Sequence, residues 1–427
     1  MTPQVKQRIE QIRRSEVPEG YKKTKVGIVP CEWREIRFKN MFSRITRKNK
    51  ENNDNVLTIS AQYGLINQRD FFNKDIASDD KTNYYLLENG EFAYNKSYSN
   101  GYPYGALKRL DMYNKGIVSP LYICFAATKE NKCPDFFVHY FEAGKMNREI
   151  QAFAQEGARN HGLLNIAVDD FFNSNIVAPS IPEQEKIAEI LSAQDKLISL
   201  KEKLIEAKKR QKKYIVHEIL SQNITLQKQD GSKYPQWKTN NIGTYLTSRN
   251  TKQIPTEEAP LMAFVADVGV VPKGERYDRS FLVKSDEKEY KRTELNDFIY
   301  SSNNLDVGSI GLNNYGSAVI SVVYEIFSVN SNAIPIVISE IIQMKSNINK
   351  ILRYRQGALY GQYRIFAEDF LSVNIDVPSL EEQQAIAKIM LSFEKEIELL
   401  QQELEQHKQK KKALMQLLLT GIVRVNR

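Results

Sequence analysis

The sequence predicts an α+β protein built from two tandem, similar modules, each a mixed α+β domain followed by a long helix. Three observations predict this fold class: an internal repeat, two uninterrupted helical segments at equivalent positions, and strand-like runs that recur in the same order in both halves. With 427 residues, the chain is long enough for each domain to bury its own core.

The internal repeat has a period of about 200 residues and is clearest where a hydrophobic run enters each helix. The segment IVAPSIPEQEKIAEIL starts at Ile176, and IDVPSLEEQQAIAKIM starts at Ile375. Upstream, GEFAYN from Gly90 resembles NDFIYS from Asn296. The only two tryptophans follow a proline at the start of each copy, in VPCEW and in YPQW. So many matches in one order indicate a duplication.

Two long helices are expected at 181–222 and 379–421. Each begins at an S-x-x-E capping box, at Ser180 and at Ser379, in which the serine accepts a free backbone N–H and the glutamate reaches back to the cap residue. Apolar residues recur at heptad spacing, so we expect the helices to pair as an antiparallel coiled coil, with a domain at each end. The predicted interface residues are Leu191, Ile198, Ile205, Ile219, Met390, Ile397, Leu404 and Leu418.

The rest of the chain divides into an N-terminal helix at 1–20, a first domain at 21–180 and a second domain at 223–378. Both domains mix short strand-like runs with turn signals. GIVSPLYICFAA from Gly116 and SAVISVVYEIFSVN from Ser317 are rich in β-branched and aromatic residues, which is typical of buried strands. We therefore expect each domain to be organised around a twisted sheet.

Charge and cysteine content narrow the class of protein. Sixty Lys and Arg against 52 Asp and Glu give a formal charge of +8, which is compatible with a polyanionic partner. Two basic runs, at 208–213 and 407–412, occupy equivalent stretches of the helices; they could face DNA or a partner, although a solvated helix face is the favoured interpretation for most of these side chains.

The chain has no apolar run long enough for a membrane span and no signal peptide. Its three cysteines form no CxxC pair, which disfavours disulfides and zinc, so we expect a cytoplasmic protein.

The polar loops after equivalent strands differ between the copies, as two readers of different sequences would require. Asn and Gln can bond adenine, Arg and Lys can bond guanine, and Tyr can contact phosphates or stack, although any one of these residues could be an ordinary loop residue. The candidates in the first copy are Lys96, Ser97, Tyr98, Tyr102, Tyr104, Lys108, Arg109, Arg159, Asn160 and His161. Those in the second copy are Ser301, Ser302, Asn303, Asn304, Tyr360, Gln362, Tyr363 and Arg364.

No catalytic motif was found. The chain has no phosphate-binding loop, dinucleotide fingerprint, zinc-protease motif or nucleophile elbow, and it lacks the signature of the amino-methyltransferases. Its four histidines are scattered, so we expect no metal. One E-x-K, from Glu289 to Lys291, would need a further acidic residue to act as a nuclease site, and coincidence explains it better. The sequence therefore predicts a protein without catalysis and without a cofactor of its own.

These motifs resemble the specificity subunit of Type I restriction-modification systems. The Pro-x-W and Pro-x-x-W entries to the two copies, GIVSPLY before a strand, and IPEQEKIAEIL opening a long helix carry the resemblance, which extends from about Val17 to Val425. The second copy departs in detail, since Val322 stands where the first copy has Pro120.

The resemblance implies a non-catalytic prokaryotic protein with two target-recognition domains that each read half of a bipartite target in double-stranded DNA. The helices would act as a spacer and help to dock two methyltransferase subunits, and restriction/translocase subunits would join that core. S-adenosylmethionine, ATP and Mg would belong to those partners.

Three alternatives remain open at this point. The chain could be a nuclease or methyltransferase in its own right, or a coiled-coil scaffold or receptor-binding protein that reads no DNA. Within the family, it could serve a modification-only defence system that lacks cleavage.

Overall fold

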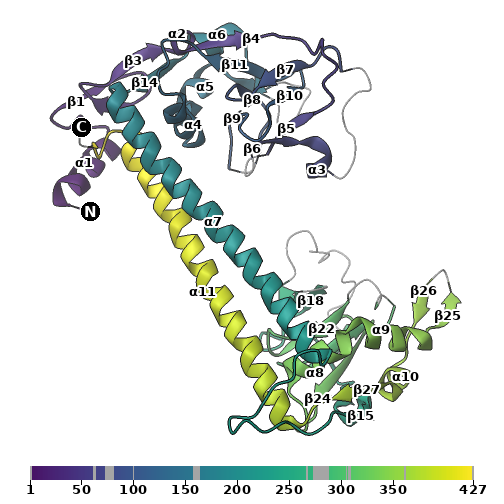
Figure 1. Cartoon of the computed structure of the whole chain (residues 1–427). Helices are drawn as coiled ribbons and strands as arrows, with labels where there is room; N and C mark the ends of the chain where they lie inside the picture. Colours follow the sequence, from purple (N-terminus) through teal and green to yellow (C-terminus); the bar gives the residue numbers. More distant parts are fainter. Residues whose placement is uncertain are drawn as a thin grey trace. The chain divides into compact units, whose positions relative to one another are not determined.

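The computed structural model describes residues 2–60, 64–72, 81–99, 101–156, 164–265, 268–272, 288–303, 305, 309–359 and 362–425 (Figure 1). The chain divides into two units. The first comprises Met1–Lys203 and Gln402–Arg427, and the second comprises Leu204–Gln401. Each unit therefore contains one globular domain together with a segment of each long helix, because the boundary falls inside both helices.

The first unit is organised around a four-stranded antiparallel sheet. Its strands, in the order in which they pair, are β4 (Phe42–Ile45), β11 (Ile123–Ala127), β8 (Phe92–Asn95) and β9 (Ala106–Arg109). Five antiparallel strand pairs accompany the sheet: β1 (Tyr21–Lys23) with β2 (Ile28–Pro30), β3 (Arg34–Arg37) with β14 (Asn175–Ala178), β5 (Leu57–Ser60) with β6 (Gly64–Asn67), β7 (Tyr85–Glu88) with β10 (Lys115–Val118), and β12 (Gln155–Glu156) with β13 (Leu164–Asn165). Its short helices are α1 (Pro3–Arg13), α2 (Phe38–Met41), α3 (Gln68–Phe72), α4 (Pro134–Glu142), α5 (Asn147–Phe153) and α6 (Val168–Asn173).

The second unit repeats this plan. Its four-stranded sheet has the order β16 (Leu246–Ser248), β24 (Tyr324–Val329), β21 (Phe298–Ser301) and β22 (Ile310–Leu312). The accompanying strands are β15 (Lys238–Asn241) with β27 (Asn374–Val377), β18 (Met262–Val265) with β19 (Gly269–Pro272), β20 (Tyr290–Thr293) between β17 (Lys252–Gln253) and β23 (Ala318–Ile320), and β25 (Gln356–Leu359) with β26 (Gln362–Arg364). Its short helices are α8 (Pro335–Gln343), α9 (Lys345–Ile351) and α10 (Ala367–Ser372), with single 3₁₀ turns at η1 (Ile242–Thr244) and η5 (Leu352–Tyr354).

Strand register confirms that the two domains are copies of one fold. Phe125 of β11 lies opposite Phe92 of β8, and Phe327 of β24 lies opposite Phe298 of β21. The four strands of each central sheet occur in the same sequence order and pair in the same spatial order. The prediction of two similar α+β domains is therefore correct.

The two cores use different side chains at the same helix positions. Helix α4 buries Phe136, Phe137, Tyr140 and Phe141, whereas α8 buries Val337, Ile338, Ile341 and Ile342. Both sets follow the spacing that puts residues on one helix face, so either can cover a sheet. Packing of aromatic rings in one unit and of aliphatic chains in the other explains how one fold survives with little sequence identity.

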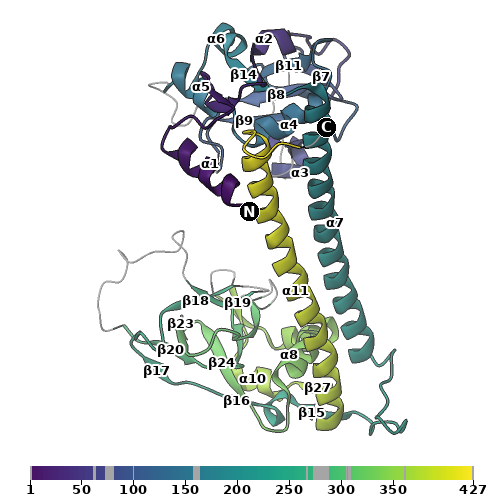
Figure 2. The ribbon, with the colours of Figure 1, turned by 90° about the vertical axis from the view of Figure 1, so that its left-hand side faces the viewer.

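The two long helices are α7 (Ile181–Leu220) and α11 (Leu380–Leu418), close to the predicted ranges. Inside the first unit Asp195 pairs with Lys411 and Lys201 with Glu403, each at 2.5 Å. Inside the second unit Lys208 pairs with Glu396 and Lys212 with Glu394, each at 2.7 Å. Partner numbers on α11 fall as those on α7 rise, so within each unit the helix segments run antiparallel (Figure 1 and Figure 2).

The predicted interface residues are all buried or half-buried along these segments. Leu191, Ile205, Ile219, Met390 and Leu418 are buried, and Ile198, Ile397 and Leu404 are half-buried. Several lysines of the two basic runs lie beside this interface and pair with acidic residues of the other helix. Those lysines therefore contact the neighbouring helix.

One detail of the capping prediction is wrong. Ser379 does accept the backbone N–H of Glu382 at 3.3 Å, but neither glutamate reaches back to its cap residue. Glu183 instead binds Arg424 at 2.6 Å, and Glu382 accepts the indole N–H of Trp237 at 3.1 Å. Both glutamates are buried, so each takes a donor inside the protein in place of the half-exposed helix start.

The two ends of the chain lie together in the first unit. The hydroxyl of Tyr21 donates to the carbonyl of Gly421 at 2.7 Å, and Arg424 pairs with Glu32 at 2.8 Å. Gly421 adopts a φ of 69°, and a Cβ there would lie 2.5 Å from Cγ of Pro30. A glycine is therefore required where the C-terminal segment approaches the start of the first domain. Among the helices described, none is long and apolar enough to span a membrane.

Candidate nucleic-acid interface

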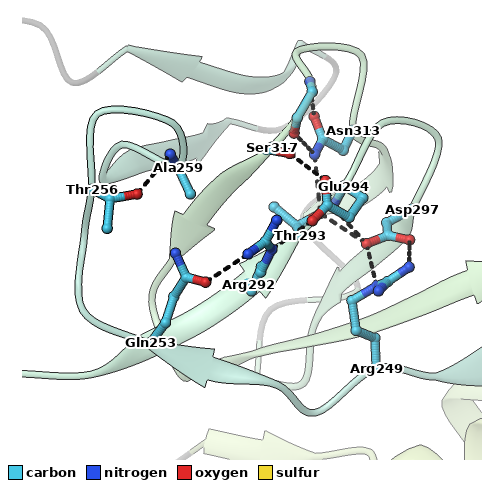
Figure 3. Close-up of polar contacts among 11 residues, drawn as sticks. Arg249, Gln253, Thr256, Ala259, Arg292, Thr293, Glu294, Asp297, Asn313 and Ser317 are labelled. Atoms are coloured by element: carbon cyan, nitrogen blue, oxygen red, sulfur yellow. Dashed lines mark hydrogen bonds and ion pairs between the residues drawn. The ribbon is translucent and has the colours of Figure 1, made fainter.

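An acid–arginine pair, with its carboxylate buried in the second unit and half-buried in the first, anchors the start of the strand that leads into the first polar loop of each unit. In the second unit Asp297, directly before β21, is only 2% exposed and pairs with Arg249 at 2.8 Å (Figure 3). In the first unit Glu91, directly before β8, pairs with Arg47 at 2.7 Å. Burial raises the pKa of both carboxyl groups, and a backbone N–H and the arginine oppose that rise. The same pair in both units holds the strand from which the loop departs.

A wider polar network surrounds this pair in the second unit, as Figure 3 shows. Arg292 lies between Glu294, at 2.5 Å, and the side-chain oxygen of Gln253, at 2.9 Å. The fully buried Asn313 donates to the hydroxyl of Thr293 at 3.1 Å. These side chains satisfy one another, so the network holds β17, β20 and the adjoining turn together.

Two predicted residues in the first unit form a cluster around one carboxylate. Tyr102 donates to Glu142 of α4 at 2.6 Å, and Lys108 donates to the Tyr102 hydroxyl at 3.0 Å and pairs with the same carboxylate. Burial alone would raise the pKa of Glu142, but the ammonium of Lys108 holds that pKa below its ordinary value. The contacts of Tyr102 and Lys108 therefore tie the loop to α4.

Arg109 and Tyr104 are also engaged within the first unit. Arg109 lies between Asp111, at 2.7 Å, and Asp135, at 2.6 Å. The ring of Tyr104 packs half-buried against the core, and its carbonyl accepts the Tyr94 hydroxyl at 2.6 Å. Both residues stabilise the base of the loop.

Among the described candidates of this loop, Tyr98 is the most exposed, with 63% of its surface accessible. Lys96 and Ser97 beside it are half-buried. The backbone N–H of Ser97 donates to the side chain of Asn95 at 3.1 Å, which turns the chain at the strand end. The structure thus presents an exposed aromatic ring in an anchored loop.

The equivalent loop of the second unit begins with buried residues. Ser301 and Ser302 are each only 3% exposed, and the Ser302 hydroxyl donates to the carbonyl of Val323 at 3.3 Å. Asn303 is half-buried, and Asn304 lies outside the described residues. In this structure the two serines lie at the carboxyl end of β21, an interior strand of the sheet, and are not accessible to a base.

A two-stranded hairpin between the same two short helices carries the remaining candidates in each unit. In the first unit Arg159, Asn160 and His161 fall between β12 and β13, outside the described residues. In the second unit Tyr360 also lies outside them, and Gln362 opens β26. The hairpin thus occupies an equivalent position in both units.

The described part of the second hairpin is basic and aromatic. Tyr363 is 51% exposed, and the guanidinium of Arg355 lies 5.7 Å from its ring centroid. Arg364 is exposed; it lies 3.4 Å from Glu325 and its guanidinium lies over the ring of Phe366 at 4.9 Å. An exposed tyrosine flanked by two arginines suits contact with a phosphate and a base.

The E-x-K segment places its lysine inside the sheet. Lys291 is 7% exposed, pairs with Glu325 at 2.7 Å and donates to the carbonyl of Tyr324 at 2.9 Å. Across the residues that the structure describes, no group of three or more His, Cys, Asp or Glu could hold a metal ion. The lysine therefore serves the packing of the sheet.

Sequence reasoning missed these acid–arginine pairs. The signal was present: an acidic residue directly precedes the aromatic strand in both copies, and an arginine follows the first sheet strand, at Arg47 and Arg249. Comparison of the two copies for shared charges, and not only for shared apolar residues, would have found it.

Comparison with known proteins finds a family model that matches part of this chain and a relative that aligns with most of it. Residues 219–409 match the model of the family described as "Type I restriction modification DNA specificity domain". Over 432 aligned residues the chain is 23% identical to the "Putative type I restriction enzyme MjaX specificity subunit" of Methanocaldococcus jannaschii, with 95% of this chain and 97% of the relative covered.

One solved structure supports the fold, and a second is reported beside it. A chain from a study of "complex assembly" and "conformational transition of the type I R-M system" matches with a TM-score of 0.51 at 13% identity, covering 92% of this chain and 99% of the other. The HsdS subunit from Thermoanaerobacter tengcongensis matches with a TM-score of 0.46 at 14% identity, covering 92% and 98%. Residues 219–409 thus match the Type I specificity domain, and the whole chain is similar to a specificity subunit of a Type I restriction-modification system.

Proposed function

We propose that this chain is the sequence-specific DNA-binding subunit of a Type I restriction-modification complex, and that each unit reads one half of a bipartite DNA target. One observation carries the proposal: the two units share the order and register of their sheets, while the loops that leave those sheets differ completely in sequence. Constant scaffolds with different polar loops suit two readers of unlike half-sites.

The described residues best suited to contact DNA are the exposed ones. They are Tyr98 in the first unit and Tyr363 with Arg364 in the second. Arg159, Asn160, His161, Asn304 and Tyr360 remain candidates by sequence. Tyr102, Lys108 and Arg109 support the first loop through their internal contacts, as Ser301 and Ser302 support the second.

The remaining roles belong to the assembly. In this proposal the paired helices set the gap between the half-sites, two methyltransferase subunits dock on the chain, and restriction/translocase subunits join them in the prokaryotic cytoplasm. S-adenosylmethionine, ATP and Mg act in those subunits, since members of this family are non-catalytic.

The test is DNA binding by the complex reconstituted with its methyltransferase subunit. We expect a sequence-selective gel shift that weakens as salt rises. Tyr98→Ala and Tyr363→Ala should each lower affinity about tenfold without changing stability, since loss of one such contact costs ~1–3 kcal/mol. Tyr315→Ala, which removes a ring that is 49% exposed outside the predicted loops, is the matched control and should bind normally.

Binding without sequence selectivity, or no binding at all, would instead favour a coiled-coil scaffold that reads no DNA. A modification-only system would show the same selective shift, and the presence or absence of a restriction subunit in the complex distinguishes it.

A further inference from the structure

Each unit contains a basic pocket at an equivalent place. In the second unit a pocket of about 930 Å³ lies between the last third of α7 and the turn from α8 to α9. In the first unit a pocket of about 330 Å³ lies between the last third of α11 and the turn from α4 to α5. The two pockets arise from the duplication, because the same helix segment meets the same turn in both.

Some of the lysines in these pockets are already paired. Lys212 pairs with Glu394 at 2.7 Å, and its equivalent Lys411 pairs with Asp195 at 2.5 Å. Lys408 pairs with Glu202 at 2.8 Å. These lysines link the two helices.

Two further lysines line each pocket without an ion pair among the residues described. They are Lys213 and Lys345 in the second unit and Lys412 and Lys145 in the first, one from the long helix and one from the turn in each case. Burial lowers the pKa of Lys145 to about 8, which shows how poorly its ammonium is compensated. A carboxylate from outside would supply the missing counter-charge.

Each pocket also contains one acidic residue. Glu142 in the first is held by Lys108 and Tyr102. Glu340 in the second is largely buried, and burial raises its pKa, with Lys212 opposing the rise. Cations outnumber carboxylates in the lining of both pockets, so an anionic ligand remains favoured.

The floor of each pocket is apolar. Val216, Leu220 and Met344 line the second, and Met415 and Ala143 line the first. DNA phosphates would leave these side chains uncovered, whereas a protein segment with acidic and apolar side chains would cover them and neutralise the lysines. The loops proposed to read the half-sites differ between the two units, whereas the pockets recur. Two copies of one partner would therefore fit the two pockets.

We infer that the two basic pockets are equivalent docking sites for an acidic, partly apolar segment of the methyltransferase subunit, one copy in each pocket. This inference rests on the proposed function, since it assigns the surface that the partner recognises. It predicts that the two sites can be lost separately.

The experiment is native mass spectrometry of the full chain with its methyltransferase subunit. The second-unit variant carries Lys213→Glu with Lys345→Glu, and the first-unit variant carries Lys412→Glu with Lys145→Met. Each should weaken binding of one copy at least tenfold, leaving one copy per chain, and the combined variant should bind none. The control variant carries Lys196→Glu with Lys395→Glu, at exposed helix positions outside the pockets. It changes the net charge by the same amount as the second-unit variant and should keep two copies.

The outcomes separate the two proposals. If the pocket variants keep both copies, the pocket assignment is wrong while DNA reading stands. If they keep both copies and lose DNA affinity with a smaller salt dependence, the pockets hold phosphates and the assignment is also wrong. If the unmodified chain binds no methyltransferase subunit, the proposed function itself fails. Circular dichroism of each variant, expected to match the unmodified chain, separates lost docking from lost folding.

Discussion

Arg249 and Asp297 show what most of the conspicuous charges do in this protein. Together with Arg47 and Glu91 they form the same ion pair at the start of the same strand in both units. Such a pair contributes little net free energy, but in the second unit, where Asp297 is only 2% exposed, removal of one partner leaves the other without its counter-charge in a largely buried place. The pair therefore fixes a loop-bearing strand.

Removal of Asp297 tests that role. Asp297→Ala leaves Arg249 unpaired and a backbone N–H of Glu294 without its acceptor, which lies at 2.7 Å. We expect the free energy of unfolding of the second unit to fall by about 3 kcal/mol. Hydrogen exchange, measured separately over β21 and β8, should show the loss in the second unit alone.

Two variants control this prediction. Asp297→Glu should recover part of the loss, because the first unit uses Glu91 there, and the exposed Glu289→Ala should change nothing. Equal destabilisation by Glu289→Ala would contradict the assignment.

Lys145 gives a pH dependence. Its folded-state pKa of about 8 lies below the ordinary 10.5, so between these values the unfolded chain binds more protons and stability rises with pH. Below pH 8 the buried ammonium destabilises the first unit. Lys145→Met should therefore raise the melting temperature at pH 7, and the advantage should shrink as pH approaches 10.5. A constant advantage across this range would contradict the assignment.

Residue-level contacts were the least predictable feature. Lys108 looks like a DNA contact in the sequence, yet its partner Glu142 is 34 residues away on a helix. Nothing local reports such a pairing. In contrast, the exposure of Tyr98 and Tyr363 follows from their positions at strand ends and in hairpins, where loops reach the surface.

Helices α7 and α11 were predictable because their signals are local. Capping residues, heptad spacing and the absence of helix breakers fixed their ends to within a few residues. The order of the sheet was not predictable, because β11 pairs with both β4 and β8 through contacts distant in sequence. The internal repeat predicted only that the two domains share one strand order, and not which order that is.

The paired helices carry a prediction at this scale. Lys201 and Glu403 pair at 2.5 Å, so removal of 198–204 together with 400–406 deletes one heptad from each helix and preserves the interface. The spacer loses about 10 Å, and we expect the gap in the DNA target to shorten by about three base pairs.

Both half-sites should remain unchanged in that variant, as read from methylated DNA. A shortened spacer with an unaltered gap would show that the helices do not set the spacing, and a changed half-site would show that they take part in reading.

For the whole molecule, duplication explains more than any single site. One module supplies two sheets of the same order, two loop sets that differ, two helix segments and two basic pockets. Under the proposed function, two copies of one partner would bind the repeated surfaces, and the two unlike halves of the DNA target would contact the divergent loops.

The most direct test of this account is a genome-wide map of methylated adenines in cells that carry the gene, in cells that lack it, and in cells where residues 41–165 come from a relative. We predict a bipartite motif that appears only with the gene, and a chimera that changes one half of it while the other half and the gap stay constant. No gene-dependent motif, or a chimera in which both halves change, would contradict the claim that each unit reads its own half-site.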